Sequence, residues 1–318
     1  MAVMSKAGVS VPLAPRRKGM SISRREAMWG MIFLSPWIVG ILLFTAIPMV
    51  ASLVLSLTNY NPIHPEELRF IGLHNFTRLL SDPGMFQAAG VTLRFTLISV
   101  PLSIIIPLGL AVLVNAKHLL GKNVFRALFY MPYMIPAVVG VMVWGGILNS
   151  DSGWLNRFLG MAGIEGPRWL QDESWVVPAI VIMGFWGVGN AMLIFLAGLQ
   201  NVPTELYEAA KVDGAGPVYT FFKITVPMIS PVIFYNLTLA LIGSFQVFVP
   251  GYIIGNGRGD PNGATMFYNI YLYKTAFDFQ DMGYGTTLAW AMFVVVLILT
   301  VIMFKTQSRW VYYAGGEE

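Results

Sequence analysis

Aromatic and uncharged polar side chains recur in two long apolar stretches of this 318-residue chain. Aromatic faces and a few neutral hydrogen-bonding groups are the chemistry that holds uncharged, hydroxyl-bearing molecules in protein pockets. In a membrane helix, however, Ser, Asn and Gln side chains also bond to neighbouring helices. Both interpretations stay open for the seven candidate residues, which are Trp186, Gly187 and Asn190 in the first stretch and Asn236, Ser244, Gln246 and Phe248 in the second.

Residues suited to acid–base, metal or phosphate chemistry are absent or scattered. The chain has no cysteine, and its three histidines, His64, His74 and His118, are scattered on loops, whereas metal sites need clustered ligands. The tripeptide Gly121-Lys122-Asn123 lacks the first glycine and the hydroxyl residue of a phosphate-binding loop. The sequence therefore predicts no metal site, no ATP site of that kind and no enzyme active site in this chain.

Composition places these residues in a lipid bilayer. Only 11% of the residues are charged and 56% are hydrophobic, against about 25% charged in a soluble domain. A bilayer core needs roughly 20 mostly apolar residues per helix, and prolines are tolerated inside such helices. We therefore predict an all-α integral membrane protein with six transmembrane helices, over residues 28–57, 91–115, 127–149, 175–200, 225–250 and 284–305.

The distribution of lysine and arginine predicts the orientation. With the N-terminus inside, thirteen basic residues fall in inside segments and seven in the longer outside segments, and basic residues favour the cytoplasmic side. We therefore expect both termini to be cytoplasmic. The expected segments are an N-terminal tail (1–27), a retained first helix (28–57), an external loop (58–90), a membrane domain (88–306) and a C-terminal tail (307–318).

Arg94 is the ionisable residue that the sequence places near the bilayer, at the outer end of the second helix. Snorkelling to the headgroups is the favoured interpretation, and a structural partner inside the bundle is the alternative. Proton-coupled carriers usually need an intramembrane carboxylate or histidine relay. The apolar stretches contain no such carboxylate or histidine, which argues against a proton-coupled carrier.

One short polar segment lies between the fourth and fifth apolar stretches, on the predicted cytoplasmic side. Pro203 suits the first turn of a helix, and Glu205 and Glu208 lie near its positive N-terminal end. Gly214 is placed to end the helix in a left-handed conformation, and a second short helix is expected over about 217–223. Spacing alone would allow an ordinary interfacial connector.

This segment resembles the EAA loop of binding-protein-dependent ABC importer permeases, whose pattern is E-A-A-x3-G-x9-I-x2-P. The matching residues are Glu208, Ala209, Ala210, Gly214, Ile224 and Pro227. The resemblance extends over residues 68–313, including "FRALFYMPYMIPAVVG" and "FLAGLQNVPTELYEAA". Over this range the sequence is similar to the maltose-type first permease subunits of carbohydrate uptake. The stretch 246–261 departs from the family, because it lacks an acidic residue and a Gly-Gly-Pro turn soon after the fifth helix.

The resemblance implies a type I ABC importer fold in a bacterial or archaeal cytoplasmic (inner) membrane. This chain would form half of the pathway for a sugar, oligosaccharide or related solute. Its partners would be a second permease subunit, an external solute-binding protein and two ATPase subunits that bind ATP and Mg²⁺; the chain itself would bind no cofactor and no nucleic acid. An importer for a non-sugar solute and an ion-coupled carrier remain the alternatives.

The resemblance also implies roles for particular residues. The EAA loop (201–225) would dock on an ATPase subunit, with Glu208, Ala209, Ala210, Asp213 and Gly214 as the coupling residues. The sugar contacts of the family fall in its fourth and fifth helices, and Asn190 and Ser244 lie at matching positions.

Overall fold

The computed structural model describes residues 22–312, which are almost entirely helical. One isolated antiparallel bridge, between Thr58 and Phe70, is the only β pairing in this range. The α-helices are α1 (Ile22–Ile41), α2 (Ile47–Ser56), α3 (His74–Leu79), α4 (Pro83–Asn115), α5 (Lys122–Tyr130), α6 (Ala137–Ile147), α7 (Trp154–Met161), α8 (Val176–Phe185), α9 (Gly189–Gln200), α10 (Thr204–Val212), α11 (Pro217–Thr220), α12 (Val226–Met228), α13 (Ser230–Phe245), α14 (Val249–Ile254), α15 (Tyr268–Tyr273) and α16 (Met282–Thr306).

Shorter 3₁₀ and π segments join these helices. The 3₁₀ segments are η2 (Pro65–Glu67), η3 (Met131–Met134) and η6 (Gln307–Arg309), and the π segments are η1 (Leu42–Ala46), η4 (Phe221–Thr225) and η5 (Lys274–Asp278). By length and composition, four helical runs among the described residues are able to cross a membrane, or six if each of two bent pairs is one span. The structure therefore supports an all-helical membrane protein with four to six candidate spans.

The chain divides into two compact units, of which the first is residues 1–52. Its helical run begins at Ile22, within the predicted N-terminal tail, and residues 1–21 of that tail lie outside the described residues, as do 313–318 of the C-terminal tail. The π segment η1 comes just before Pro48, which has no N–H to donate. A wider i→i+5 turn at this position accommodates the missing hydrogen bond, so the helix continues through the proline.

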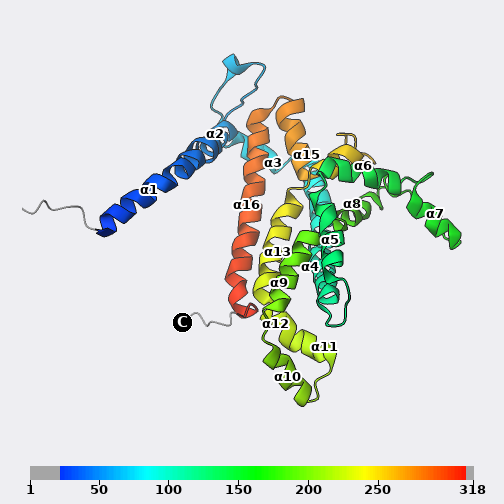
Figure 1. The fold of residues 1–318 in the computed structure, drawn as a ribbon. Coiled ribbons are helices and arrows are strands. Elements are labelled where there is room, and N and C mark those ends of the chain that lie inside the picture. Colours follow the sequence, from blue (N-terminus) through cyan, green and yellow to red (C-terminus); the bar gives the residue numbers. More distant parts are fainter. Residues whose placement is uncertain (1–21, 313–318) are drawn as a thin grey trace, which may run out of the picture. The chain divides into compact units, whose positions relative to one another are not determined.

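The second unit is built around α4, α9, α13 and α16, of which α4 packs against both α9 and α13 (Figure 1). Its inner core contains Ala111 and Val114 of α4 with Met192 and Phe195 of α9, all fully or almost fully buried. A Cβ at Gly198 would lie 2.9 Å from the Val232 side chain. Glycine at this position therefore lets α9 and α13 approach closely.

Two of the predicted spans are bent pairs of helices instead of straight rods. The run from α5 through η3 turns by 103° into α6, and α8 turns by 53° into α9. Ile135, which precedes Pro136, has an extended backbone with ψ of 129°, as expected of a residue before proline. The sequence predicts a span over 127–149 in which prolines are tolerated as kinks, and in the structure the chain turns sharply before α6, whose N-cap is Pro136.

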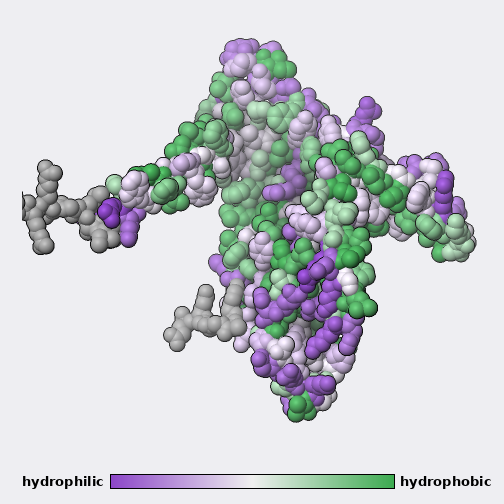
Figure 2. Space-filling model, in the orientation of Figure 1, coloured by the Kyte–Doolittle hydropathy of each residue, from purple (hydrophilic) through white to green (hydrophobic). Residues whose placement is uncertain are grey.

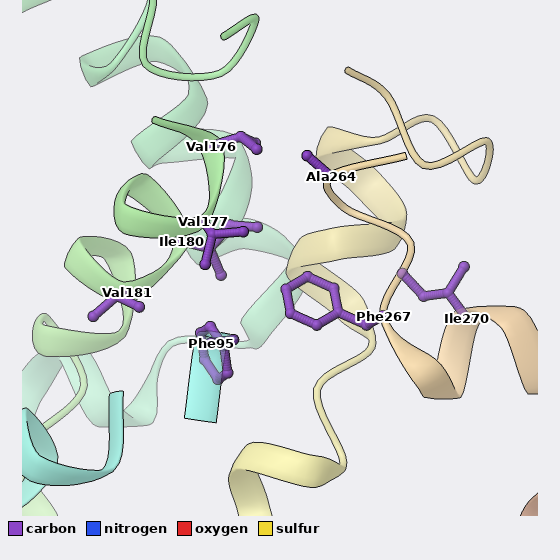
Figure 3. Packing of buried hydrophobic residues seen from close by; sticks show 8 residues of the cluster. All are labelled: Phe95, Val176, Val177, Ile180, Val181, Ala264, Phe267 and Ile270. Atoms are coloured by element: carbon purple, nitrogen blue, oxygen red, sulfur yellow. The ribbon is translucent and has the colours of Figure 1, made fainter. Parts of the chain in front are cut away.

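A second hydrophobic cluster holds α8 against α4 and the segment before α15 (Figure 3). The rings of Phe95 and Phe267 meet edge to face, with centroids 5.5 Å apart and planes at 89°. Val177 and Ile180 of α8 pack into the same cluster, and both are almost fully buried. This packing fixes the end of α8, where the helix breaks at Trp186 and Gly187.

Candidate functional site

A cavity of about 320 Å³ lies beside the break between α8 and α9. Trp186 and Gly187 of the break line it, together with Trp144 of α6, Val247 of the segment before α14 and Pro250 of α14. The rings of Trp144 and Trp186 meet edge to face, with centroids 6.2 Å apart. The cavity is large enough for a small organic molecule, and its walls are mainly aromatic and apolar.

The seven residues proposed from sequence are distributed unevenly around this cavity. Trp186 and Gly187 line it, whereas Asn190, Asn236, Ser244, Gln246 and Phe248 are not among its lining residues. The buried side chains of Asn236 and Ser244 donate to carbonyls of their own helix, those of Val232 and Leu241. Each of these side chains therefore has a hydrogen-bond acceptor within its own helix.

The remaining candidates lie close to the α13–α14 junction or on α9. Gln246 is exposed and Asn190 is half-buried. The ring of Phe248 stacks on that of Tyr252, with centroids 5.1 Å apart, and meets Tyr273 edge to face. Phe248, Tyr252 and Tyr273 therefore form an aromatic cluster next in sequence to Val247, which lines the cavity.

A second, more polar cavity of about 530 Å³ shares Val141 with the first. Gln171, Asn256 and Asp260 supply its polar groups, and Ile253 and Ile254 of α14 supply apolar wall. The loop after α14 is held in place by a 2.9 Å hydrogen bond from Asn262 Nδ2 to Glu173 Oε2. Hydrogen-bonding groups thus line one cavity and mainly aromatic and apolar side chains line the other, and the two share Val141 of α6.

The polar segment after α9 folds as the helix–turn–helix that the sequence predicts. Helix α10 ends at Val212, and Gly214, two residues later, has a φ of 76°. The N–H of Ala215 donates to the carbonyl of Ala210 at 2.9 Å, and the N–H of Gly214 donates to that of Lys211 at 3.2 Å. This pair of bonds is a Schellman motif, so the predicted role of Gly214 as helix stop is confirmed.

The second half of this loop returns toward the bundle through α11 and η4. The N–H of Val226 donates to the carbonyl of Phe221 across the π turn that precedes Pro227, which repeats the arrangement before Pro48. The hydroxyls of Tyr207 and Thr225 lie 3.0 Å apart and join α10 to η4. Hydrophilic residues gather over this end of the second unit in Figure 2.

A concave surface of about 750 Å³ lies between α10 and the returning segment. Four of the five predicted coupling residues line it, namely Ala209, Ala210, Asp213 and Gly214. Ala210 is buried, whereas Glu208 is exposed outside the concave surface. The structure therefore brings four of the coupling residues together around one hollow and leaves the carboxylate of Glu208 free to meet another surface.

Sequence reasoning missed a polar network at the N-terminal end of α4. Asp82 caps this helix, accepting from the N–H groups of Gly84 and Met85 through Oδ1. Its Oδ2 accepts hydrogen bonds from the hydroxyls of Tyr271 at 2.7 Å and Tyr284 at 2.6 Å. One carboxylate thus joins the ends of α4, α15 and α16.

The same network fixes the protonation state of its members. Burial alone would raise the pKa of Asp82, but the hydrogen bonds from Tyr284, Tyr271 and two backbone amides outweigh it and lower that pKa. Burial, together with the bond to Asp82, raises the pKa of Tyr271 to about 12. Asp82 is therefore an anion and Tyr271 a neutral donor throughout the physiological range.

Arg78 and Asp281 enclose this network on its exposed side. The guanidinium of Arg78 lies 3.9 Å from the centroid of the Tyr284 ring and donates a 2.6 Å hydrogen bond to Asp281 Oδ2. Asp281 also accepts from the N–H of Tyr284 at the start of α16. Arg94, by contrast, donates to the carbonyl of Ser174 at 3.3 Å, so it has a partner inside the chain.

A protein-family profile matches about two thirds of the chain. The profile described as "Binding-protein-dependent transport system inner membrane component" matches residues 99–310, from the middle of α4 to just beyond η6. The chain belongs to this family, which comprises the permease subunits of binding-protein-dependent ABC importers. It is therefore a multi-pass permease of the inner membrane and a transport subunit without its own ATPase.

Individual relatives cover nearly the whole chain. It is 41% identical over 307 residues to the "Probable ABC transporter permease protein YesP" of Bacillus subtilis (strain 168), covering 95% of this chain and 97% of that protein. It is 31% identical over 301 residues to the "Arabinooligosaccharides transport system permease protein AraP" of the same organism, covering 93% and 94%.

A solved structure supports the fold. A bacterial alginate ABC transporter, crystallised with an alginate pentasaccharide-bound periplasmic protein, contains a chain that matches this one with a TM-score of 0.76. The match covers 91% of this chain and 96% of that chain at 22% identity. The helical arrangement described above is thus that of an ABC importer permease.

Proposed function

We propose that this permease carries a neutral sugar or oligosaccharide. The observation that supports this most directly is the 320 Å³ cavity at the α8–α9 break, where two tryptophan rings meet beside mainly apolar walls. Aromatic faces suit the apolar C–H face of a sugar ring, and the neighbouring polar cavity offers Gln171, Asn256 and Asp260 for hydroxyl groups. The relative that transports arabinooligosaccharides supports the same solute class.

The chain forms half of a translocation pathway in this proposal. Six spans, with both bent pairs counted as spans, and two cytoplasmic termini give a type I importer fold with α10 and α11 on the cytoplasmic side. A second permease subunit completes the pathway, an external binding protein delivers the solute, and two ATPase subunits supply ATP hydrolysis. The membrane domain is residues 88–306, preceded by the external loop 58–90.

The EAA loop transmits the ATPase movement to the membrane helices. The hollow beside α10 receives the ATPase surface, and the small side chains of Ala209 and Ala210 allow close approach. Exposed Glu208 pairs with a basic residue of that surface. Because the Tyr207–Thr225 contact ties α10 to η4, movement of α10 passes through η4 and α12 to α13.

Transport by the assembled complex tests the solute class. The permease, its second permease, the ATPase pair and the binding protein are reconstituted in proteoliposomes and supplied with ¹⁴C-labelled maltose, trehalose, lactose and arabinotriose. ATP-dependent uptake of at least one sugar is expected, with ATP hydrolysis stimulated by the sugar-loaded binding protein. The proposal would be overturned if the proteoliposomes took up none of these sugars but did take up amino acids. It would also be overturned if an ion gradient alone, without ATP, drove the uptake.

A charge reversal tests the coupling role. Glu208→Lys is expected to insert in the membrane normally and to lose the ATPase subunits during purification, because it places like charges at the contact. Glu205→Lys, also exposed and three residues earlier on α10, is the control and should retain them. Wild-type transport by Glu208→Lys would rule out the proposed pairing.

A further inference from the structure

Helix α7 presents a stripe of large apolar side chains to its surroundings. Trp154, Phe158 and Met161 recur at spacings of four and three residues, so they share one face of the helix. They are 68%, 64% and 82% exposed, and together with Arg157 they line a shallow hollow of about 130 Å³. Single exposed apolar residues are ordinary, but a contiguous apolar patch marks a contact with a partner or a membrane.

The other side of α7 fixes the direction of this stripe. Leu155 and Leu159 pack against the buried cluster that contains Trp169. Asn156 accepts a 2.6 Å hydrogen bond from Nε1 of Trp169 and donates one of 3.2 Å to the carbonyl of Pro167. Because the helix is held along this side, it does not rotate to bury the stripe against its own chain.

The neighbouring helices place α7 at a boundary of the membrane. Residues 148–153 alone connect it to α6, and the segment after it leads to α8, which starts at Val176. Helices α6 and α8 each belong to a bent pair that is one span in the proposed six-span topology. The end of α6 and the start of α8 then lie on the same, outer side of the bilayer. Figure 1 shows α7 beyond α6, away from α4, α9 and α13, so its stripe lies at the edge of the bundle.

The exposed side chains of this connection suit the boundary between lipid headgroups and acyl chains. Trp154 and Trp175, near its two ends, are both exposed, and tryptophan is enriched at this depth of a membrane. Arg157 is exposed beside the stripe and has no ion pair among the residues that the structure describes. An arginine at this depth lays its stem along apolar surface and extends its guanidinium to the phosphates.

A bilayer explains this face better than a soluble protein does. A binding protein that docks and leaves would expose the stripe to water between deliveries, whereas lipid covers it at all times. The interfaces of transient complexes are also about as polar as the rest of a protein surface. Helix α7 has only one charged residue, Arg157, and no acidic residue, so its charge complements a lipid phosphate.

We propose that α7 lies in the outer leaflet, with its apolar stripe among the upper acyl chains and Arg157 at the phosphates of phospholipids. The apolar face of such a helix enters this boundary by about 5–10 Å. The inference rests on the six-span topology of the proposed function and adds a lipid contact that does not depend on the solute. Because the cluster under Leu155 and Leu159 includes residues of α6 and α8, the bilayer then holds the outer ends of both bent pairs.

Nitroxide labels on single cysteines measure where the stripe lies. The chain has no cysteine, so Phe158→Cys, Met161→Cys and the control Gly160→Cys each carry one label. Gly160 is exposed outside the stripe, and a Cβ there meets nothing within 4 Å. The complete transporter, with the cysteines of its other subunits replaced, is placed in nanodiscs of phosphatidylethanolamine and phosphatidylglycerol. Collisions of the label with oxygen, which concentrates in the bilayer, are compared with collisions with a water-soluble nickel chelate.

The ratio of oxygen to chelate collisions distinguishes lipid from the other possible occupants. It is expected to be about threefold or more higher at residues 158 and 161 than at residue 160, with or without the binding protein. Equal ratios at the three positions would overturn the proposal. Protection of 158 and 161 from both reagents would overturn it in favour of the second permease. Access to the chelate that is lost on adding the binding protein would overturn it in favour of that protein.

Substitutions of Arg157 test the phosphate contact. In the labelled Met161→Cys protein, Arg157→Glu is expected to lower the oxygen-to-chelate ratio about twofold, because a carboxylate is repelled from the phosphates. Arg157→Lys keeps the charge and should leave the ratio unchanged. An unchanged ratio with Arg157→Glu would overturn the phosphate contact.

Sugar uptake by proteoliposomes separates this inference from the proposed function. If sugar is taken up while the three labels give equal ratios, the lipid contact of α7 is wrong and the proposed function stands. If residues 158 and 161 lie in lipid but no sugar is taken up, the lipid contact stands and the proposed function is wrong.

Discussion

The hydroxyl of Tyr284 donates a 2.6 Å hydrogen bond to Oδ2 of Asp82, which lies 202 residues earlier in the chain. The contact joins the first residues of α16 to the first turn of α4, two of the long apolar helices. A substituent on Gly84 would collide with the Tyr271 ring at 2.9 Å, so the helix start is shaped to admit the second tyrosine. One carboxylate thereby fixes the relative position of three helix ends.

Replacing Asp82 tests how much this junction contributes to the stability of the fold. Asp82→Asn keeps one acceptor oxygen but loses the charge, so one tyrosine hydroxyl or the helix cap becomes poorly satisfied. We expect the detergent-solubilised protein to lose about 2 kcal/mol of stability, measured as a lower thermal unfolding midpoint. Asp172→Asn is the control, because the Asp172 side chain accepts only from the N–H of Ser174 and an Asn oxygen can do the same. An unchanged midpoint for Asp82→Asn would show that the junction is redundant.

The alkaline limit of stability depends on Tyr271. Its pKa is raised to about 12 by burial and by the bond to Asp82, from about 10 in the unfolded chain. The folded state therefore holds this proton more tightly, and the stabilisation is present below pH 10 and lost as the pH rises through 12. Thermal midpoints measured from pH 8 to 12 should fall less steeply for Tyr271→Phe than for wild type. The exposed Tyr235→Phe variant should follow the wild-type curve, and parallel curves for all three proteins would contradict this assignment.

Local sequence signals predicted the helices α10 and α11 and the turn between them well. The helix stop at Gly214 and the second helix followed from glycine and proline positions that act within one turn. The bend of 103° was missed because prolines in membrane helices are either accommodated or not, depending on neighbours that a single sequence does not show. Pro101 and Pro107 lie inside α4 without ending it, whereas Pro136 starts a new helix.

Long-range contacts explain what else the sequence did not reveal. The partners of Asp82 come from helices about 190 and 200 residues away, and no spacing rule connects them. Trp144 lies in an apolar stretch where an aromatic residue is unremarkable, so only its place in the cavity wall beside Trp186 distinguishes it. The sequence proposed Asn236 for its residue type and Ser244 also for its position in the resemblance, and the structure shows that each donates to a carbonyl within its own helix.

The start of α9 depends on the absence of a side chain at Gly189. A Cβ at this position would lie 2.2 Å from the carbonyl oxygen of Phe129 and 2.6 Å from the Cα of Tyr130. Both are backbone atoms, so Gly189→Ala forces the two bent pairs apart and is expected to cost about 1–3 kcal/mol. Gly184→Ala, where a Cβ meets nothing within 4 Å, is the control on the neighbouring helix. The thermal midpoint should fall for the first variant only, and equal midpoints would show that the helices can separate freely.

The coupling loop depends on the left-handed conformation of Gly214 rather than on space around it. Its φ is 76°, and a Cβ there would meet nothing within 4 Å. Asn tolerates this conformation, whereas a β-branched side chain does not. Gly214→Val should therefore insert in the membrane at wild-type levels but redirect the chain after α10, opening the hollow lined by Ala209 and Asp213.

Two readouts separate a local change in the loop from general misfolding. We expect Gly214→Val to lose most ATPase subunits on affinity purification and to abolish sugar-stimulated ATP hydrolysis, with a thermal midpoint of the permease close to that of wild type. Gly214→Asn should retain both the subunits and the activity. If Val and Asn behave alike, the backbone turn at residue 214 is not what presents α10 to the ATPase, and the coupling role assigned to this loop would have to rest on the side chains of α10 alone.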